Sequence, residues 1–295
     1  MVASLGIIKA WLSSAKDVPH SRSTLFEHLV ATHSILSAWN VSPYVSRAGL
    51  IHSVYSTQFF FDGIFTLDQR PQVRTMVGKK AEALAYQFCT LDRHTLWGEV
   101  KVSSIPSLLH AKAHSGVGLV RLDRSTIVSL AQLECANEVE QACGDNGSPG
   151  HWMSWTLATI QALPGGVPLK LKTLPAITEK DEASAREAYE KYLYSGCVDQ
   201  SLLIESVSLN PNVPEVYTFL AITALDQRQF ELAHKHNRKA LELRKAWGCS
   251  WDRRIQDKDW ADITSQLAAA VAAQNRPAIS VSSLRARLLK EVEIQ

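Results

Sequence analysis

The chain has 295 residues, of which 46% are hydrophobic and 20% are charged. This composition is typical of globular domains and excludes a collagen-like, coiled-coil or largely disordered protein. The 31 basic and 29 acidic residues leave a formal net charge of only +2, so the charge predicts neither nucleic-acid binding nor attraction to an anionic membrane.

The sequence predicts a cytoplasmic protein without a membrane span. It contains no run of about 18 uninterrupted apolar residues. The N-terminus places its apolar residues before its lysines, which favours a first helix over a signal peptide. The five cysteines are dispersed and form no Cys-x-x-Cys pair, a pattern typical of a reducing compartment.

The first 142 residues predict one helix after another. From Ser23 to Trp39, apolar residues recur at three- and four-residue steps and form one helical face, for which Ser21 or Ser23 can serve as the N-cap. A second, more fully buried helix is expected from Val45 to Tyr55.

Two further helices follow in this part. Pro71 opens a third helix because proline suits the first helical turn, and Gly78 can divide that helix into two. A fourth helix is expected from Arg124 to Ala142, with Asp123 as its N-cap. The only strand candidates, with an extended loop as the alternative for each, are Val117–Leu122 and Val167–Leu171.

Breaks rich in glycine and proline mark the middle of the chain. They cover residues 144–150 and 164–175, with room for one short helix between them. Helical patterns resume at Glu179. The sequence therefore predicts an all-α protein of two domains, residues 1–178 and 179–295.

The second domain contains a predicted helical hairpin. From Val213 to Leu243, two helical patterns flank the turn DQRQ, which is too short for anything but an αα-turn between antiparallel helices. Residues 206–243, with SLNPNVPEVYTFLA before this turn and KALEL near the end, resemble tetratricopeptide-type hairpins. The resemblance implies apolar side chains that dock into neighbouring helices. An ordinary helical hairpin is the alternative.

Two histidines lie 24 residues apart in the first half of the chain. His28 stands in FEHLVAT on the first predicted face, and His52 stands in AGLIHSVYST. Residues 15–142 resemble the HD superfamily of helical metal-dependent phosphohydrolases and related diiron oxygenases. The resemblance is closest to stringent-response alarmone hydrolase domains, through VGKKAEALA after the second histidine. It extends to uncharacterised HD-like domains that carry His-Ser-x-Tyr-x-Thr.

The resemblance implies a metal site that is altered in this chain. HD domains combine a histidine, a His-Asp pair and a later aspartate, whereas Ser53 and Asn137 stand at the two aspartate positions here. A serine hydroxyl cannot bridge two metals as an anion, and an asparagine amide binds divalent ions less well than a carboxylate. His28 and His52 remain as ligands for one divalent transition metal, Fe, Mn or Zn.

Two interpretations of the histidines remain open. As metal ligands they need a third ligand, for which the candidates are His20, His33, His110, His114 and Glu140. As core residues they need only hydrogen bonds, and Asn137 can supply one to His52 or to Ser53.

Further side chains are candidates for catalysis or ligand binding. Tyr55 can place a hydroxyl near the histidines, while Arg70 and Arg93 can bind an anion or pair with a nearby aspartate, Asp68 or Asp92. The candidate catalytic residues are His28, His52 and Tyr55. The candidate ligand-binding residues are His20, Ser53, Thr57, Arg70, Arg93, Asn137 and Gln141.

The C-terminal region is expected to pack rather than to bind nucleic acid. Trp247, Trp251 and Trp260 lie among basic residues, but neighbouring aspartates oppose stacking on a nucleic acid. Residues 279–292 predict an amphipathic helix that docks on the protein or on a second copy. A homo-oligomer or a protein partner at the C-terminal helices therefore remains open, and no membrane partner is expected.

Two functions from different classes follow. The first is an HD-derived enzyme with an altered His-Ser site that acts on a small anionic molecule by metal-assisted hydrolysis or oxidation. The alternative is a catalytically inactive HD-like domain that binds a ligand or partner, with the helical-repeat module as its interaction surface.

Overall fold

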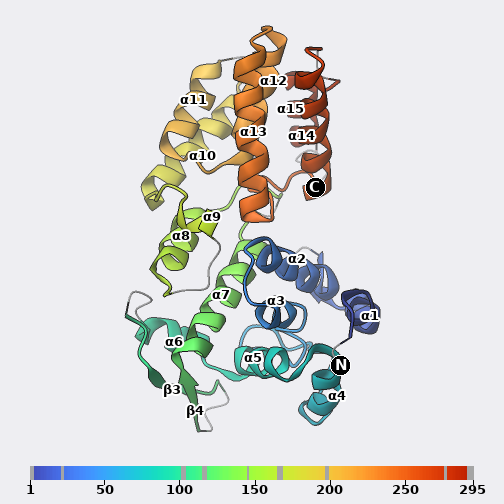
Figure 1. The fold of residues 1–295 in the computed structure, drawn as a ribbon, viewed down its shortest axis with the longest axis vertical. Coiled ribbons are helices and arrows are strands. Elements are labelled where there is room, and N and C mark those ends of the chain that lie inside the picture. Colours follow the sequence, from blue (N-terminus) through green and yellow to red (C-terminus); the bar gives the residue numbers. More distant parts are fainter. Residues whose placement is uncertain are drawn as a thin grey trace. The chain divides into compact units, whose positions relative to one another are not determined.

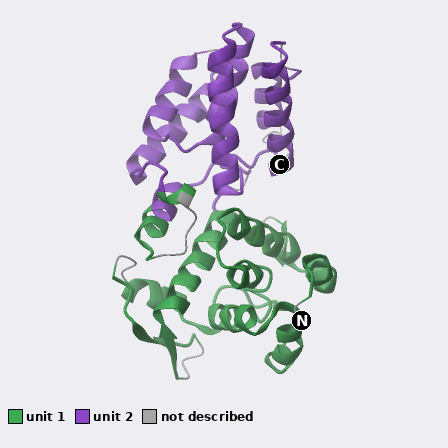
Figure 2. Ribbon diagram, in the orientation of Figure 1, with its two compact units in different colours: residues 1–141, 158–172 green, residues 142–157, 173–295 purple. Residues whose placement is uncertain are grey.

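The computed structural model describes residues 3–20, 23–100, 104–114, 118–144, 146–164, 169–196, 199–275 and 278–290. These residues are mainly helical, which confirms the all-α class. The chain forms two compact units: residues 1–141 with 158–172, and residues 142–157 with 173–295 (Figure 2). We call them unit 1 and unit 2. The boundary predicted after residue 178 falls inside the longer segment of unit 2.

Unit 1 is built around the helix α7 (Arg124–Gln141), which packs against α2, α3 and α5 (Figure 1). Its other α-helices are α1 (Leu5–Trp11), α2 (Leu25–Ala38), α3 (Pro43–Gly49), α4 (Arg70–Val77), α5 (Lys79–Thr90), α6 (Arg93–Glu99) and the short α9 (Leu169–Lys172). Two 3₁₀ helices, η1 (Leu12–Asp17) and η2 (Leu67–Gln69), complete its helical elements among the described residues. The helix α8 (Met153–Ala162) begins in unit 2 and ends in unit 1.

The helix α2 begins one residue later than the sequence suggested. Its N-cap is Thr24, whose hydroxyl accepts the backbone N–H of Glu27 at 3.3 Å. The Glu27 carboxylate in turn accepts the backbone N–H of Thr24 at 3.0 Å. The expected cap at Ser23 is therefore wrong, because Thr24 and Glu27 have the spacing of a capping box. Ser21 lies outside the described residues.

The helix expected from Val45 to Tyr55 is shorter than predicted. It ends at Gly49, and tight turns follow, in which Ile51 N–H donates to the Ala48 carbonyl at 3.0 Å. A Cβ at Gly49 would lie 2.7 Å from the Leu36 side chain, so glycine lets α3 approach α2 closely. The turns place His52 just beyond the end of α3.

Two other sequence expectations are confirmed. Gly78, with φ of 93°, separates α4 from α5, and only glycine adopts such a conformation readily. Asp123 caps α7 by accepting the backbone N–H of Thr126 at 2.8 Å.

Short strands occur only in unit 1 among the described residues. Strands β1 (Pro19–His20) and β2 (Ser23–Thr24) pair before α2, and strands β3 (Leu108–Lys112) and β4 (Leu119–Asp123) form an antiparallel hairpin. The strand β4 overlaps the candidate run at Val117–Leu122, of which Val117 lies outside the described residues. The other candidate run is wrong where it is described, because α9 begins at Leu169.

Unit 2 consists of successive helices, most of which pack on their neighbours in the chain. They are α10 (Glu179–Tyr194), α11 (Gln200–Leu209), α12 (Pro214–Asp226), α13 (Phe230–Trp247), α14 (Asp257–Ala272) and α15 (Val281–Lys290). The pairs α10–α11 and α12–α13 pack closely, and residues 227–229 connect the second pair. The two helices expected on either side of the DQRQ turn are therefore present.

The buried centre of unit 2 is rich in tryptophan. Trp247, Trp251 and Trp260 are fully buried, which confirms that they pack inside the protein. The Trp247 ring meets Trp152 edge to face, with centroids 4.9 Å apart. Glu182, also fully buried, accepts the backbone N–H groups at the start of α8, including Trp152 N–H at 2.9 Å. These contacts join the two segments of unit 2, residues 142–157 and 173–295.

Among the described residues, no helix combines the length and the apolar character needed to cross a membrane.

Candidate functional site

His28 and His52 lie side by side in unit 1. His28 projects from α2 and His52 from the turns after α3, and their Nε2 atoms are 2.9 Å apart. Both side chains are buried, with exposed fractions of 1% and 0%. We call these two residues the histidine pair. The structure thus brings together the two residues that the sequence singled out most strongly.

The other ring nitrogen of each histidine points at an acceptor. His28 Nδ1 contacts the Glu140 carboxylate, and His52 Nδ1 lies 2.9 Å from the Gly49 carbonyl oxygen. Carboxylate and carbonyl oxygens only accept, so each Nδ1 carries a proton. Burial, together with the neighbouring His28, holds the pKa of His52 well below its usual value. His52 is therefore neutral, and its Nε2 lone pair faces His28.

Asn137 brings an acceptor oxygen to the same point. Its Oδ1 lies 2.9 Å from His52 Nε2 and also accepts a hydrogen bond from Gln141 Nε2 at 3.2 Å. Asn137 Nδ2 donates to Glu138 at 3.3 Å, which is consistent with this orientation of the amide. A proton on His28 Nε2 could bridge the two rings, whereas a cation bound by two neutral rings could also bind the Asn137 oxygen.

The histidine pair could supply two ligands to one metal ion. Metal-binding histidines usually donate their second ring N–H to a carboxylate or a backbone carbonyl, as His28 and His52 do. Two nitrogens bound to one tetrahedral ion at about 2.1 Å lie about 3.4 Å apart, so the two rings would have to separate slightly from their 2.9 Å spacing to bind one ion. Within the described ranges, however, no three His, Cys, Asp or Glu side chains are placed to hold an ion together. Asn137 and solvent would have to complete the ligands.

A cavity of about 400 Å³ adjoins the histidine pair in unit 1. We call it the unit 1 cavity, and it is lined by Pro19, His20, Thr57, Phe59, Phe60, Asp62, Arg93, Asn137, Glu138 and Gln141. The ring of His20 stacks on that of His28, with centroids 4.1 Å apart. Burial and the neighbouring His28 lower the pKa of His20 to about 4. Neither His28 nor His52 lines the cavity. His20 and Asn137, which contact these two residues and also line the cavity, separate the histidine pair from the cavity.

Arg93 is the one basic side chain among the residues that line the cavity. It is buried, and its Nη1 donates to both Glu134 oxygens at 2.8 and 2.9 Å. The expected pairing with Asp92 is wrong, because Asp92 instead caps α6 through the Thr95 N–H at 3.0 Å. Since Glu134 balances Arg93, the remaining acidic groups at the cavity, Asp62 and Glu138, attract cations more than anions.

Tyr55 and Arg70 lie in a different cluster, outside the cavity lining. The Tyr55 hydroxyl donates to Glu82 at 3.3 Å, and burial and Glu82 raise the pKa of that hydroxyl. Glu82 is fully buried and also accepts from Arg70 Nε at 2.5 Å and Arg74 Nε at 2.7 Å. Arg70 therefore pairs with Glu82 rather than with Asp68. We call Glu82, Arg70, Arg74 and Tyr55 the Glu82 cluster.

The remaining candidates differ in how they relate to the cavity. Thr57 lines it, and its Oγ1 accepts the backbone N–H groups of Phe59 and Phe60 at 3.2 and 3.1 Å. Gln141 lines it next to Asn137. Ser53 is buried but does not line it, and its carbonyl accepts the Ser56 N–H at 3.3 Å.

Of the five candidate third ligands, only His20 and Glu140 contact the histidine pair in the part of the chain that the structure describes. His33 is half-buried, and its Nδ1 donates to the Ser46 carbonyl at 2.7 Å, which links α2 to α3. His110 lies on β3 and His114 in the turn after it, so these two do not share a helical face.

Several residues around the site were not expected from the sequence. Glu134 and Glu138 lie on α7 within four residues of Asn137, and this spacing was a usable signal. The contact of the Gly49 carbonyl with His52 could not be predicted from residue type, because the group belongs to the backbone. Phe59 and Phe60 belong to three consecutive phenylalanines that end in Asp62 and Gly63, a segment with no helical or strand pattern.

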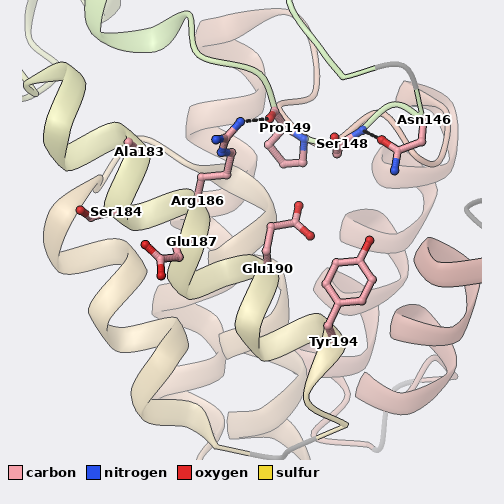
Figure 3. A pocket seen from close by; sticks show the side chains of 9 residues that line it. All are labelled: Asn146, Ser148, Pro149, Ala183, Ser184, Arg186, Glu187, Glu190 and Tyr194. Atoms are coloured by element: carbon pink, nitrogen blue, oxygen red, sulfur yellow. Dashed lines mark hydrogen bonds between the residues drawn. The ribbon is translucent and has the colours of Figure 1, made fainter.

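Unit 2 has a second cavity, of about 470 Å³. Figure 3 shows Glu190 and Tyr194 projecting from α10 toward the segment with Asn146 and Ser148, while Arg186 donates to the Pro149 carbonyl at 3.4 Å. The other lining residues are Ala183, Ser184 and Glu187. This cavity has no histidine or cysteine in its lining, so it offers no ligand of the type that His28 and His52 supply.

Comparison with known proteins adds one family match. Residues 11–93 match the model of a family described as a domain of unknown function, DUF6817. No curated protein matches the chain, and no solved structure matches it. The matched segment includes His20, His28, His52 and Arg93 but ends before Asn137 and Glu140. The match therefore covers the histidine pair without assigning an activity to it.

Proposed function

We propose that unit 1 is an HD-like domain in which His28 and His52 hold one divalent transition metal, Fe, Mn or Zn, and that it acts as an enzyme on a small anionic molecule by metal-assisted hydrolysis or oxidation. The observation that carries this proposal is the convergence of two Nε2 atoms 2.9 Å apart, with both Nδ1 protons directed to acceptors. Two buried imidazoles that face each other with lone pairs repel unless a proton or a cation lies between them.

Each residue has a defined part in this proposal. Glu140 and the Gly49 carbonyl orient the two rings, and Asn137 supplies a neutral oxygen ligand. A bound metal would act as a Lewis acid on a substrate oxygen or as a redox centre. His20 and Asn137, which touch the histidine pair and line the cavity, stand between the metal and the substrate.

The proposed anionic substrate depends on the metal charge. Arg93 is already paired with Glu134, and Asp62 and Glu138 also line the cavity. Without a metal, these groups would repel a small anion more than they attract it. A divalent cation beside Asn137 would reverse that balance, so we expect an anion to bind only to the metal-loaded chain.

Metal titration tests the proposal. The chain, treated with a chelator and dialysed, is titrated with Zn²⁺, Mn²⁺ and Fe²⁺ by calorimetry, and bound metal is counted by elemental analysis. We expect about one ion per chain for wild type and loss of that ion in His28→Ala and His52→Ala. His33→Ala is the matched control, because His33 lies on the same helix but forms its hydrogen bonds with Ser46 and Ser37, outside the pair. Metal binding that survives both pair substitutions would contradict the proposal.

The second candidate is a ligand- or partner-binding protein without catalysis. It is favoured by one observation: His28 and His52 are buried and do not line the cavity. In this version, the helix pairs α10–α11 and α12–α13 would form a tetratricopeptide-like interaction module. His52→Ala separates the two candidates. A folded variant with normal stability that has lost metal supports the enzyme, and a destabilised variant of a chain that never bound metal supports the binding protein.

A further inference from the structure

Two of three consecutive phenylalanines, residues 59–61, line the unit 1 cavity. Phe59 and Phe61 have exposed fractions of 67% and 78%, although phenylalanine is usually buried. Phe59 and Phe60 line the cavity, and Phe61 does not. The same loop thus presents two cavity-lining rings and one ring that faces elsewhere.

The loop that carries these rings is held in one shape. The Thr57 N–H donates to the Phe60 carbonyl at 2.6 Å, and the Thr57 hydroxyl accepts two further backbone N–H groups of the loop. The Ser56 hydroxyl donates to the Phe61 carbonyl at 2.9 Å and accepts the Gly63 N–H at 3.2 Å. A Cβ at Gly63 would lie 2.4 Å from the Ser56 nitrogen, so the close turn needs glycine. The exposed rings are therefore presented by an ordered loop.

The rings also contact the polar residues of the cavity. The Arg93 guanidinium lies 4.1 Å from the centroid of the buried Phe88 ring and 5.3 Å from that of Phe59. The Phe60 ring lies 4.9 Å from the His20 ring. Thr57, Asn137 and Gln141 supply polar groups to the same cavity. One part of the lining is therefore aromatic and another part is polar.

We infer that the ligand of the unit 1 cavity is amphipathic. Its apolar part, an aromatic ring or a short acyl chain, packs on Phe59 and Phe60, and its polar end lies against Asn137 and His20. This inference deepens the proposed function, because it names the substrate class of that site. It rests on that function only for the chemical reaction at the polar end of the ligand. Phe59 is then a specificity-determining residue.

Two other occupants of the exposed rings are less well supported. Asp62 follows Phe61 directly and would repel an anionic membrane surface. A contact with a second copy of the chain would use Phe59 and Phe61 equally, since both are exposed. Only a ligand inside the cavity distinguishes Phe59 from Phe61, and this difference supplies the test.

The experiment uses two neutral amides as probes, so that neither metal nor charge is required. Binding of 4-fluorobenzamide and of fluoroacetamide to the chelator-treated full chain is followed by fluorine NMR. Contact of the ring with Phe59 and Phe60 should make 4-fluorobenzamide bind about tenfold more tightly than fluoroacetamide, a difference that corresponds to about 1.4 kcal/mol. Phe59→Ser should remove most of this preference. Phe61→Ser, at a similarly exposed position on the same loop, should keep this preference.

Each alternative result overturns the inference. It fails if the ring-bearing probe has no advantage, if neither probe binds saturably, or if both substitutions have the same effect. It also fails if sedimentation shows a dimer that both substitutions dissociate, because the rings would then join two copies. Repeating the titration with Zn²⁺ separates this inference from the proposed function. Zinc that neither binds nor alters the affinity of either probe would refute the metal site while leaving the preference for a ring intact.

Discussion

Unit 1 contains two buried polar clusters that differ in how well their hydrogen-bonding groups are matched. In the Glu82 cluster, one buried carboxylate receives donors from two arginines and a tyrosine. In the histidine pair, the two Nε2 atoms and the Asn137 oxygen converge, and they are matched only if a proton on His28 Nε2 or a cation lies between them. A matched cluster needs nothing further and is explained by folding. An unmatched cluster requires a proton or a cation, and this difference is why we place the function at the histidine pair.

The largest loss of stability is expected from a substitution in the Glu82 cluster. Glu82→Gln removes the charge that two arginines share, and we expect it to lower the free energy of unfolding by about 2–3 kcal/mol. The value is below that of a fully buried ion pair because the Arg74 side chain is 42% exposed, so water screens it. Urea denaturation measures the change. Glu99→Gln, at an exposed position of unit 1, is the control and should change stability by less than about 0.5 kcal/mol. Equal effects would mean that the cluster is not structural.

For the histidine pair, we expect the stability of the chain to depend mainly on whether a metal is bound. At a zinc concentration about a hundred times the dissociation constant, binding should stabilise the folded chain by about 2.7 kcal/mol. His28→Ala and His52→Ala should lose this gain, since each removes one of two imidazole ligands. Denaturation with and without zinc measures it. An undiminished zinc effect in either variant would show that the ion binds elsewhere.

Glu215 in unit 2 gives a pH-dependent contrast to both clusters. Its Oε1 accepts the Trp251 N–H at 3.0 Å, and its other oxygen is buried without a partner among the described residues. Burial raises the pKa of Glu215 to about 8 from its usual value of 4.5. Because the folded state then holds the proton more tightly than the unfolded state, stability should fall as the pH rises from about 4.5 to 8.

Glu215→Gln tests this pH dependence. The variant keeps an oxygen for Trp251 and removes the ionisation, so it should be more stable than wild type by up to about 4 kcal/mol at pH 8 and nearly unchanged at pH 4. Thermal melting across this range measures the difference. A stability difference that is the same at both pH values would show that the ionisation of Glu215 has no part.

The smallest expected effect comes from improving the metal ligands. Asn137→Asp replaces a neutral oxygen by a carboxylate at 2.9 Å from His52 Nε2 and should tighten metal binding by about tenfold, or about 1.4 kcal/mol. Calorimetry measures the change. Ser53→Asp should have less effect, because Ser53 is buried away from the cavity lining. Unchanged affinity in Asn137→Asp would remove Asn137 from the ligand set.

Sequence reasoning succeeded where the signal is local. Gly78 marked a helix break because its backbone conformation has a steric cause, and Asp123 marked a cap because its side chain acts within one turn. The 24-residue spacing of His28 and His52 led to the prediction that these side chains meet, which the structure confirms, while the HD resemblance itself stays a prediction.

It failed where the partner is distant in sequence. Arg93 has its carboxylate partner 41 residues away, and Arg70 reaches Glu82 across a helix break, so nearby aspartates were the natural but wrong choices. The early end of α3 at Gly49 also escaped, because it depends on close packing against Leu36 on another helix. Such pairings are decided by tertiary packing, which local patterns do not encode.

The most direct test of the central claim is a long-range proton–nitrogen NMR spectrum of the histidine rings, recorded before and after zinc is added. The account predicts that His28 and His52 carry their protons on Nδ1 in the metal-free chain, and that zinc shifts both Nε2 resonances while leaving those of His33 in place. A proton found on Nε2 of either ring, with no change on adding zinc, would show that a hydrogen bond alone joins the pair and would contradict the account.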